Sequence, residues 1–280
     1  MIFAFLLGCC EPLGRPGGEI SILTYNVHGL PPEITGDDTT ARMEQIGPLL
    51  KGFDIVGLQE DWLDENHAVL DEAVDYPTRD RETEKLDDRA YGKGLAMFAA
   101  RESVASAGDF YTTCYGTIEN ASDCFASKGW RMLRLDLLGA EVDVYNTHLE
   151  AGGGPEDDAA RGAQVDALID AIANESADRA VIFVGDTNLE DTDPEDEPLI
   201  RKLEDETGLV NACVALDCPE PERIDRVMFR GSGNVSVDAD SWSVAEEFAD
   251  SEGVPLSDHE PIAVTLAWGG PMPPSCGLFL

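Results

Sequence analysis

Short apolar runs that end abruptly in polar side chains recur along the chain, and this pattern constrains the fold more than any other feature. The run at 181–185 is Val-Ile-Phe-Val-Gly, and Asp186 and Asn188 follow it. Similar runs end in Asn26, Glu60, His148 and His259. Apolar β-branched runs of this length are typical of buried strands, whereas polar groups gathered at strand ends build sites at an open sheet edge. The sequence therefore predicts a site assembled from distant segments at one edge of a buried sheet.

The order of strand-like and helix-like segments predicts the architecture. Eight strand-like runs lie at 20–26, 55–59, 94–99, 132–137, 142–148, 181–185, 224–229 and 262–267. Helical spacing of apolar residues predicts helices at 39–50, 62–74 and 159–173, and a short one at 198–206. A turn containing Gly139 separates two of the strands at hairpin spacing. Hairpins interleaved with helices indicate an α+β fold in which two mixed sheets pack face to face with helices outside.

The polar strand ends belong to a single domain. The chain has 280 residues, which suffices for one large domain or two small ones. No Pro-, Ser- or Gly-rich linker separates Asn26 from His259. We therefore expect one domain over 19–268, an N-terminal segment over 1–18 and a Pro/Gly-rich tail over 269–280 that does not fold.

Acidic residues dominate the composition. There are 56 Asp and Glu against 19 Lys and Arg, which gives a formal net charge of −37. Such a field attracts cations and repels polyanions, so a large nucleic-acid footprint is disfavoured. Solubility, or adaptation to a salty medium, explains the same charge without any functional role.

The first residues carry a possible export signal. Leu6-Leu7-Gly8-Cys9 resembles a bacterial lipoprotein processing site at which Cys9 would become lipidated, although the basic region that usually precedes such a site is missing. The apolar stretch is too short to span a bilayer as a helix. We expect an exported protein, extracellular or anchored to a membrane.

Cysteine positions are consistent with export. Cys114 and Cys124, and Cys213 and Cys218, are close in sequence within loop-like stretches. Local disulfides are the natural interpretation in an oxidising compartment, and free thiols are the alternative. Cys276 lies in the tail and has no evident partner.

Carboxylates and amides at the strand ends are candidates for binding a divalent cation. Glu60 is the strongest single candidate, because hard cations such as Mg²⁺ take carboxylate oxygens and keep several waters. Asn26, Asp258, Asp186 and Asn188 are similar groups that could orient a water, an ion or a phosphate oxygen. In an extended segment, Asp186 and Asn188 would share one face. Each alone is equally consistent with a solvated strand end.

Two of the four histidines follow strands and have polar neighbours. His259 directly follows Asp258, and Asp225 on another strand could orient its imidazole. An oriented imidazole can take a proton from water near neutral pH. His148 ends its strand in the same way. His28 and His67 receive no role from the sequence, although His28 lies close to Asn26.

Seven short motifs in order resemble the endonuclease/exonuclease/phosphatase superfamily, which includes deoxyribonuclease I, inositol polyphosphate 5-phosphatases and neutral sphingomyelinases. The motifs cover roughly 19–268 and are Tyr25-Asn26, Leu58-Gln59-Glu60, Gly94-Leu95-Ala96, Asn146-Thr147-His148-Leu149, Gly185-Asp186-x-Asn188, Ile224-Asp225-Arg226-Val227 and Ser257-Asp258-His259-x-Pro261. The resemblance implies a four-layered αββα sandwich and a metal-dependent phosphoric ester hydrolase, with its site at one edge of the two sheets.

The resemblance also implies a role for each candidate. Glu60 would bind Mg²⁺, or alternatively Mn²⁺ or Ca²⁺, with Asn26 and Asp258 close by. His259, held by Asp225, would be the general base. Asp186 and Asn188 would position the attacking water and a phosphate oxygen. His148 would hydrogen-bond the phosphate.

Secondary features favour a phospholipid head group as the substrate. The segment around Lys128 resembles a Lys-Gly segment of bacterial neutral sphingomyelinases, so Lys128 could contact phosphate; a turn lysine is the alternative. Tyr111, Tyr115 and Phe125 are aromatics suited to a membrane interface, or to a self-packed loop. The acidic segment 238–250 does not resemble the membrane-inserting hairpin of some secreted sphingomyelinases.

Three functions are therefore weighed for a protein that we expect to be monomeric. The first is an exported sphingomyelinase-like phosphodiesterase. The second is an extracellular nuclease resembling deoxyribonuclease I, which needs enough salt to screen repulsion from nucleic acid. The third is an inactive family member that binds a partner; the complete set of polar strand ends argues against it.

Overall fold

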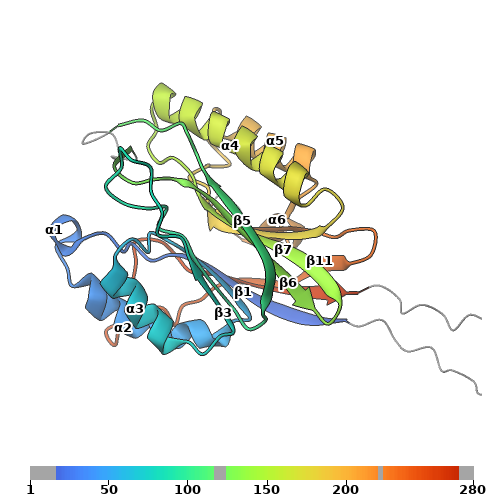
Figure 1. Cartoon of the computed structure of the whole chain (residues 1–280), viewed down its shortest axis with the longest axis horizontal. Coiled ribbons are helices and arrows are strands. Elements are labelled where there is room, and N and C mark those ends of the chain that lie inside the picture. The colour runs from blue at the N-terminus through green and yellow to red at the C-terminus, as the bar shows by residue number, and fades with distance from the viewer. Residues whose placement is uncertain (1–16, 117–123, 220–222, 271–280) are drawn as a thin grey trace, which may run out of the picture.

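Two six-stranded sheets pack face to face between layers of helices in the computed structural model, which describes residues 17–116, 124–219 and 223–270 (Figure 1). The first sheet contains β1 (Gly17–Asn26), β2 (Ile55–Gln59), β3 (Thr78–Arg81), β4 (Ala96–Ala99), β11 (Ser236–Val244) and β12 (Ile262–Gly269). The second contains β5 (Ser103–Phe110), β6 (Gly129–Leu137), β7 (Ala140–His148), β8 (Ala180–Asp186), β9 (Val210–Asn211) and β10 (Asp225–Arg230).

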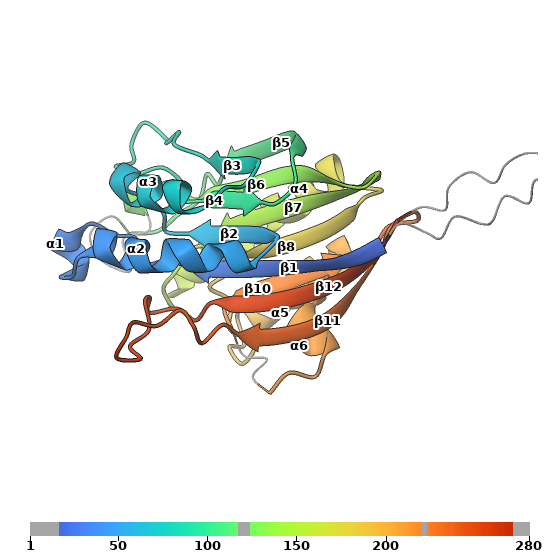
Figure 2. The same cartoon turned by 90° about the horizontal axis from the view of Figure 1, so that it is seen from below.

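The helices cover the outer faces of the two sheets. On the first sheet lie α2 (Thr39–Leu49), which continues into a 3₁₀ turn η1 (Leu50–Gly52), and α3 (Asp64–Ala73) (Figure 2). On the second lie α4 (Pro155–Glu175) and α5 (Glu197–Thr207). Two four-residue helices, α1 (Pro32–Thr35) and α6 (Ala212–Ala215), complete the set. This is the predicted α+β fold, a four-layered αββα sandwich.

Three apolar clusters correspond to the three interfaces between layers. The central one joins the inner faces of both sheets, with Ile22 and Val264 facing Val144 and Val184. On the outer face of the second sheet, the side chain of Phe183 packs with the helix layer instead. Because every residue of β8 is buried on one face or the other, this strand is apolar along its length, which is typical of a strand covered on both sides.

Strand order explains which strands the sequence pattern predicted and which it missed. The orders are β11-β12-β1-β2-β4-β3 and β5-β6-β7-β8-β10-β9. All eight predicted strands are the interior strands, and the missed ones, β3, β5, β9 and β11, are the four edges. Edge strands are half exposed and carry polar residues, as in the alternating burial of β5, so they lack a continuous apolar run.

The ends of the domain differ slightly from the predicted boundaries. Gly17 pairs with Gly269 at the start of β1 and the end of β12, so the folded strands begin two residues earlier and end one residue later than 19–268. Cys9 and Cys276 lie outside the described residues, as does most of the predicted tail. Disulfides join Cys114 to Cys124 and Cys213 to Cys218, as predicted. Within the described ranges, no helix has the length and apolarity to cross a bilayer.

Candidate active site

Strand direction brings the polar strand ends to one edge. β1 and β2 run parallel and place Asn26 beside Gln59, and β7 and β8 run parallel and place His148 beside Asp186. β10 runs antiparallel to β8, so its first residue, Asp225, also pairs with Asp186. Parallel strands end at the same edge, and an antiparallel neighbour begins there. The predicted convergence of the site residues is therefore confirmed.

Directly below this edge, hydrogen bonds tie the two sheets together. Asn146 on β7 donates through Nδ2 to the carbonyls of Leu58 (2.9 Å) and Ala96 (3.1 Å) in the opposite sheet. Its Oδ1 accepts from Gln59 Nε2 at 2.7 Å. The sheets approach so closely that a Cβ on Gly57 would lie 2.4 Å from Val184, and only glycine fits. These contacts fix the distance between the two halves of the site.

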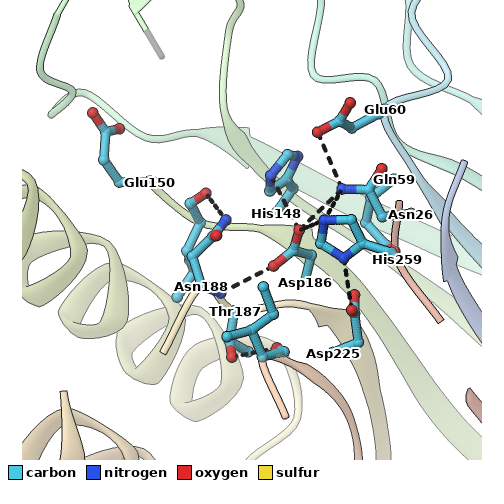
Figure 3. Close-up of polar contacts among 12 residues, drawn as sticks. Asn26, Gln59, Glu60, His148, Glu150, Asp186, Thr187, Asn188, Asp225 and His259 are labelled. Atoms are coloured by element: carbon cyan, nitrogen blue, oxygen red, sulfur yellow. Dashed lines mark hydrogen bonds and ion pairs between the residues drawn. The ribbon is translucent and has the colours of Figure 1, made fainter. Parts of the chain in front are cut away.

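Asn26 is the centre of the constellation (Figure 3). Its buried Nδ2 donates to Glu60 Oε1 (3.1 Å) and to Asp186 Oδ2 (3.0 Å). The same nitrogen lies 3.4 Å from His259 Nε2. One amide thus links residues from β1, β8 and the segments that follow β2 and precede β12. Asn26 was predicted to lie near Glu60, the candidate metal ligand, and it contacts Glu60 directly.

Two strand ends use the same local device. Asn26 Oδ1 accepts from the backbone N–H of His28, and Asp186 Oδ1 accepts from that of Asn188, each at 3.0 Å. These are Asx turns, and both His28 and Asn188 have φ of +48°. The left-handed residue contradicts the prediction that Asp186 and Asn188 share a face of an extended segment. Asn188 instead donates from Nδ2 to the Leu149 carbonyl at 3.1 Å.

His28 is the site residue that the sequence interpretation missed. Its Nδ1 lies 3.2 Å from Asp258 Oδ1 and 3.8 Å from Glu60 Oε2, so it stands between the two. Asp258 is largely exposed and, among the described residues, has no direct contact with Glu60. The signal was the spacing: His28 is two residues after Asn26, as Asn188 is after Asp186.

His259 and Asp225 form the predicted pair. His259 Nδ1 lies 2.7 Å from Asp225 Oδ2, which leaves Nε2 facing Asp186 Oδ2 at 3.7 Å. Burial lowers the pKa of His259, but the hydrogen bond and charge of Asp225, with Asp186 and Asp258, outweigh it and raise the pKa to about 10. Burial and the charge of Asp186 also raise the pKa of Asp225. Without a bound cation, His259 is an imidazolium paired with Asp225.

Glu60 has the properties of a cation ligand. Its backbone is in the left-handed region, with φ of +62°, where non-glycine residues are uncommon and often functional. Its Oε2 is buried and accepts no hydrogen bond from the part of the chain that the structure describes. Burial raises the pKa of Glu60 to about 7, against lowering contributions from Asn26 and Lys128. A buried carboxylate oxygen without a donor fits a hard divalent cation, which supplies the missing positive charge.

A second group of donor atoms also lies close together. Atoms of Asp186, Asp225 and His259 fall within 4.8 Å of one another. The hydrogen bond between His259 Nδ1 and Asp225 Oδ2 occupies one atom of each of these two residues, which leaves Asp225 Oδ1 and His259 Nε2 as the atoms that could face a cation. Among the described residues, Glu60 Oε2 accepts no hydrogen bond and has only His28 Nδ1 nearby, at 3.8 Å, so Glu60 is the better candidate for the metal ligand.

His148 and Lys128 form a buried pair at the opposite side of Asp186. Lys128 Nζ lies 3.1 Å from His148 Nε2 and donates to the Leu149 carbonyl at 2.7 Å. Burial and the Lys128 charge hold the pKa of His148 well below its usual value, so the imidazole is neutral. When Nε2 accepts from Lys128, Nδ1 carries the proton, and that buried atom lacks a protein partner in the described ranges.

Two arginines hold the loops that carry the site. Arg42 on α2 donates to the carbonyls of Val27 (3.0 Å), His28 (2.8 Å) and Leu256 (2.9 Å), and so connects the loop after β1 to the loop before β12. Arg226 on β10 donates to Thr187 Oγ1 at 3.2 Å and fixes the turn after β8. Neither arginine was assigned this positioning role from the sequence.

The predicted interfacial aromatics are only partly exposed. Tyr111 is 3 % exposed, and its hydroxyl pairs with Thr147 Oγ1 at 2.8 Å, so it is a core residue. Tyr115 is half-buried, whereas Phe125 is 45 % exposed. Of the two interpretations that the sequence left open, the self-packed one holds for Tyr111, because the residue lies directly after β5 and turns inward against β7.

Comparison with known proteins agrees with this fold and identifies the family. The sequence pattern of the Endonuclease/Exonuclease/phosphatase family matches residues 23–259, which run from within β1 to the candidate base. The chain belongs to this family.

Relatives and solved structures in this family include several sphingomyelinases. The chain is 27 % identical to a Mycobacterium tuberculosis sphingomyelinase over 271 residues, which cover 90 % of this chain and 54 % of the relative. It is 26 % identical to human sphingomyelin phosphodiesterase 2, covering 89 % of this chain and 64 % of that protein. The chain thus spans about half to two-thirds of the length of these relatives.

Solved structures share the fold at lower sequence identity. Sphingomyelinase C from Streptomyces griseocarneus superposes with a TM-score of 0.65 and 19 % identity, covering 89 % of this chain and 99 % of that one. Staphylococcus aureus beta toxin with bound magnesium ions gives a TM-score of 0.65 at 16 % identity, covering 88 % and 99 %. At this identity the likeness establishes the fold.

Proposed function

We propose that the protein is an exported, Mg²⁺-dependent phosphodiesterase that hydrolyses the phosphate ester of a phospholipid head group. The observation that carries the proposal is the arrangement around Asn26. A buried carboxylate oxygen without a donor, on Glu60, lies on one side of that amide, and an imidazole oriented by a carboxylate, His259 with Asp225, lies on the other.

The cation site and the base have different roles in the reaction: the first neutralises charge on the phosphate, and the second takes a proton from water. A divalent cation held by Glu60, with Asn26 beside it and His28 and Asp258 adjacent, would neutralise phosphoryl oxygens and lower the pKa of nearby bases. His259 Nε2 then accepts a proton from water, and the imidazolium is stabilised by Asp225. The water oxygen bonds to phosphorus while the bond from phosphorus to the lipid oxygen breaks, and that oxygen leaves and takes a proton from solvent water.

The remaining residues position the reacting groups. Asp186 accepts from Asn26 and faces both histidines, at 3.5 Å from His148 and 3.7 Å from His259, where it can orient the water. Charged Lys128, and neutral His148 through the N–H at Nδ1, would supply positive charge and a donor to a phosphate that gains negative charge in the transition state. Asn188 supports this arrangement through the Leu149 carbonyl.

The choice of a lipid substrate rests on similarity and on charge. Two relatives by sequence are named for sphingomyelin, and one structural neighbour is named sphingomyelinase C. A net charge of −37 opposes binding of a nucleic acid, which normally needs a basic footprint. A zwitterionic head group carries no net charge and is not repelled.

Parallel assays of hydrolysis test the proposal. Purified protein and its His259→Ala variant are given sphingomyelin vesicles and plasmid DNA, each with Mg²⁺ or with EDTA. We expect Mg²⁺-dependent release of phosphocholine that the substitution abolishes. Nicking of DNA with inert vesicles would contradict the lipid substrate and favour a nuclease.

Export is the second part of the proposal. It is supported by Leu6-Leu7-Gly8-Cys9 and by the two disulfides, which form readily in oxidising compartments. Labelling of expressing bacterial cells with an alkyne fatty acid tests lipidation at Cys9. Label that is lost in Cys9→Ala supports the anchor, and unlabelled protein in the cytosol would contradict export.

A further inference from the structure

Two residues with left-handed backbones face each other at the candidate cation site. His28 has φ of +48° and follows β1, and Glu60 has φ of +62° and follows β2, the parallel neighbour of β1. Non-glycine residues in this region are uncommon and concentrate at functional sites. His28 Nδ1 lies 3.8 Å from Glu60 Oε2. The strained backbone therefore brings an imidazole nitrogen close to the buried carboxylate oxygen.

Backbone contacts fix the separation of these two side chains. The N–H of His28 donates to Asn26 Oδ1 at 3.0 Å, and the His28 carbonyl accepts from Arg42 Nη2 at 2.8 Å. Gly29 packs against Glu60 so closely that a Cβ on Gly29 would lie 2.4 Å from the Glu60 carbonyl oxygen. The segments that follow β1 and β2 are thus in direct contact. A pair of side chains held in this way loses little further freedom when it binds an ion.

The distances suit two donors of one ion. Imidazole nitrogens and carboxylate oxygens bind Zn²⁺ at about 2.0–2.2 Å, so two such donors of the same ion are at most about 4.3 Å apart. The 3.8 Å between His28 Nδ1 and Glu60 Oε2 lies within this limit. Asp258 Oδ1 lies 3.2 Å from the same nitrogen, and its largely exposed side chain faces the pair from the solvent side.

From this geometry we propose that His28 is a direct ligand of the cation, together with Glu60. The proposal rests on the cation site of the proposed function and adds a nitrogen donor to it. In this role the imidazole is neutral and carries its proton on Nε2. Mg²⁺ takes oxygen ligands and keeps several waters, whereas imidazole suits transition cations such as Zn²⁺. His28 therefore shifts the preference of the site toward a transition cation, while Mg²⁺ still binds through Glu60.

Calorimetry with Zn²⁺ and with Mg²⁺ tests this ligand. His28→Asn replaces the imidazole by an amide, and asparagine adopts a left-handed backbone readily, so the turn is kept. Binding that survives in Glu60→Gln is subtracted as binding elsewhere on the chain. We expect His28→Asn to weaken Zn²⁺ binding roughly 10- to 100-fold and Mg²⁺ binding less than about threefold.

The matched control is His67→Asn, which removes a histidine that pairs with Asp61 instead of Glu60. It should leave the affinity for both cations unchanged. Equal losses of Zn²⁺ and Mg²⁺ affinity in His28→Asn would show that His28 acts only through the structure of its turn. A Zn²⁺ affinity that does not change in His28→Asn would overturn the proposal.

Pulsed EPR of bound Mn²⁺ detects a coordinated nitrogen directly. We expect coupling to nitrogen in the wild type and in His67→Asn, and none in His28→Asn. Coupling that persists in His28→Asn and disappears in His259→Asn would place the ion between Asp186, Asp225 and His259, which contradicts the proposal. A wild type without nitrogen coupling contradicts it as well.

Failure of this ligand and failure of the proposed function give different results, because the binding measurements need no substrate. Hydrolysis of lipid by a protein whose Zn²⁺ affinity does not depend on His28 overturns the ligand alone. A Zn²⁺ affinity that depends on His28, in a protein that hydrolyses no lipid, overturns the proposed function alone.

Discussion

Two buried clusters of charged residues lie near opposite ends of β7, and they differ in whether their carboxylates have hydrogen-bond partners. Near the start of the strand, Asp143 receives Arg134 Nε (2.6 Å) and Nη2 (2.9 Å) and the Ser176 hydroxyl (2.6 Å). At its end, around Asp186, Glu60 Oε2 and Asp225 Oδ1 are buried and receive no hydrogen bond from any described residue. In the first cluster the carboxylate has its hydrogen-bond partners, whereas the second contains buried carboxylate oxygens to which a ligand can supply the missing partner.

The electrostatics of the two clusters follow from this difference. Arg134 supplies Asp143 with a full countercharge, and the pair connects β6, β7 and the end of α4. Around Asp186, carboxylates lie close to each other with few cations, and the pKa values of Glu60 and Asp225 are raised. Perturbed groups of this kind concentrate at functional sites. We therefore expect the cluster around Asp143 to stabilise the fold and the cluster around Asp186 to take part in catalysis.

The largest effect is expected from His259→Gln. This variant keeps the size and polarity of the side chain but cannot take a proton, so we expect kcat to fall by about 10³-fold or more while the thermal midpoint stays within a few degrees. His67→Gln is the control. His67 also pairs with a carboxylate, since its Nδ1 lies 2.5 Å from Asp61 Oδ2, but this pair is separate from the pair of His259 and Asp225. A larger fall in kcat for His67→Gln than for His259→Gln would contradict the assignment of the chemistry to the cluster around Asp186.

Asp143→Ala should lower the stability of the protein and leave its activity nearly unchanged, which is the reverse of the effect of His259→Gln. It leaves Arg134 without its partner, so we expect the free energy of unfolding in urea to drop by about 3 kcal/mol. The activity per folded molecule should remain within about twofold. Asp240→Ala removes an exposed carboxylate and should change neither quantity. A loss of activity in Asp143→Ala at unchanged stability would contradict the assignment.

Glu60→Gln is expected to stabilise the protein while inactivating it. The folded pKa of about 7 lies above the ordinary 4.5, so Glu60 favours folding below pH 4.5, and this contribution is lost as pH rises through 7. At pH 8 without Mg²⁺, replacement by the neutral amide should raise the free energy of unfolding by about 2 kcal/mol. Glu44→Gln, at an exposed position on α2, is the control. Destabilisation by Glu60→Gln would show that its carboxylate is already satisfied.

Cation affinity should depend on pH in the same direction. Below pH 7 the Glu60 carboxyl is largely protonated and must lose its proton to become a ligand, so Mg²⁺ binding should tighten by up to about tenfold per pH unit. Above pH 7 the gain from Glu60 should level off. Calorimetry at pH 6, 7 and 8 measures this, and an affinity independent of pH would contradict the role of Glu60.

Sequence predicted the parts of the molecule in which burial dictates residue type. The eight interior strands carry continuous apolar runs, and Glu60 and Asp186 stand out where such runs stop. The prediction that His259 ends a strand was wrong, because 256–259 form a loop and His259 precedes β12. The four edge strands escaped because exposed positions accept polar residues. The role of His28 and the left-handed turn at Asn188 depend on hydrogen bonds from Asn26 and Asp186, which spacing alone does not reveal.

The aromatic residues were harder to place for a related reason. Tyr111, Phe125 and Trp62 are chemically similar, and the periodicity around them does not distinguish an inward ring from an outward one. Their exposure is decided by long-range contacts, such as that of the Tyr111 hydroxyl with Thr147 and that of Trp62 with Gly94. Residues fixed by tertiary packing therefore required the structure.

Titration of Mg²⁺ into the wild type, Glu60→Gln and Asp225→Asn, followed by hydrolysis assays on the same samples, tests the central claim most directly. The account predicts that Glu60→Gln loses Mg²⁺ binding and hydrolysis together, whereas Asp225→Asn still binds Mg²⁺ and loses only hydrolysis. Retained binding in Glu60→Gln, with loss in Asp225→Asn, would place the cation between Asp186, Asp225 and His259 and contradict the account.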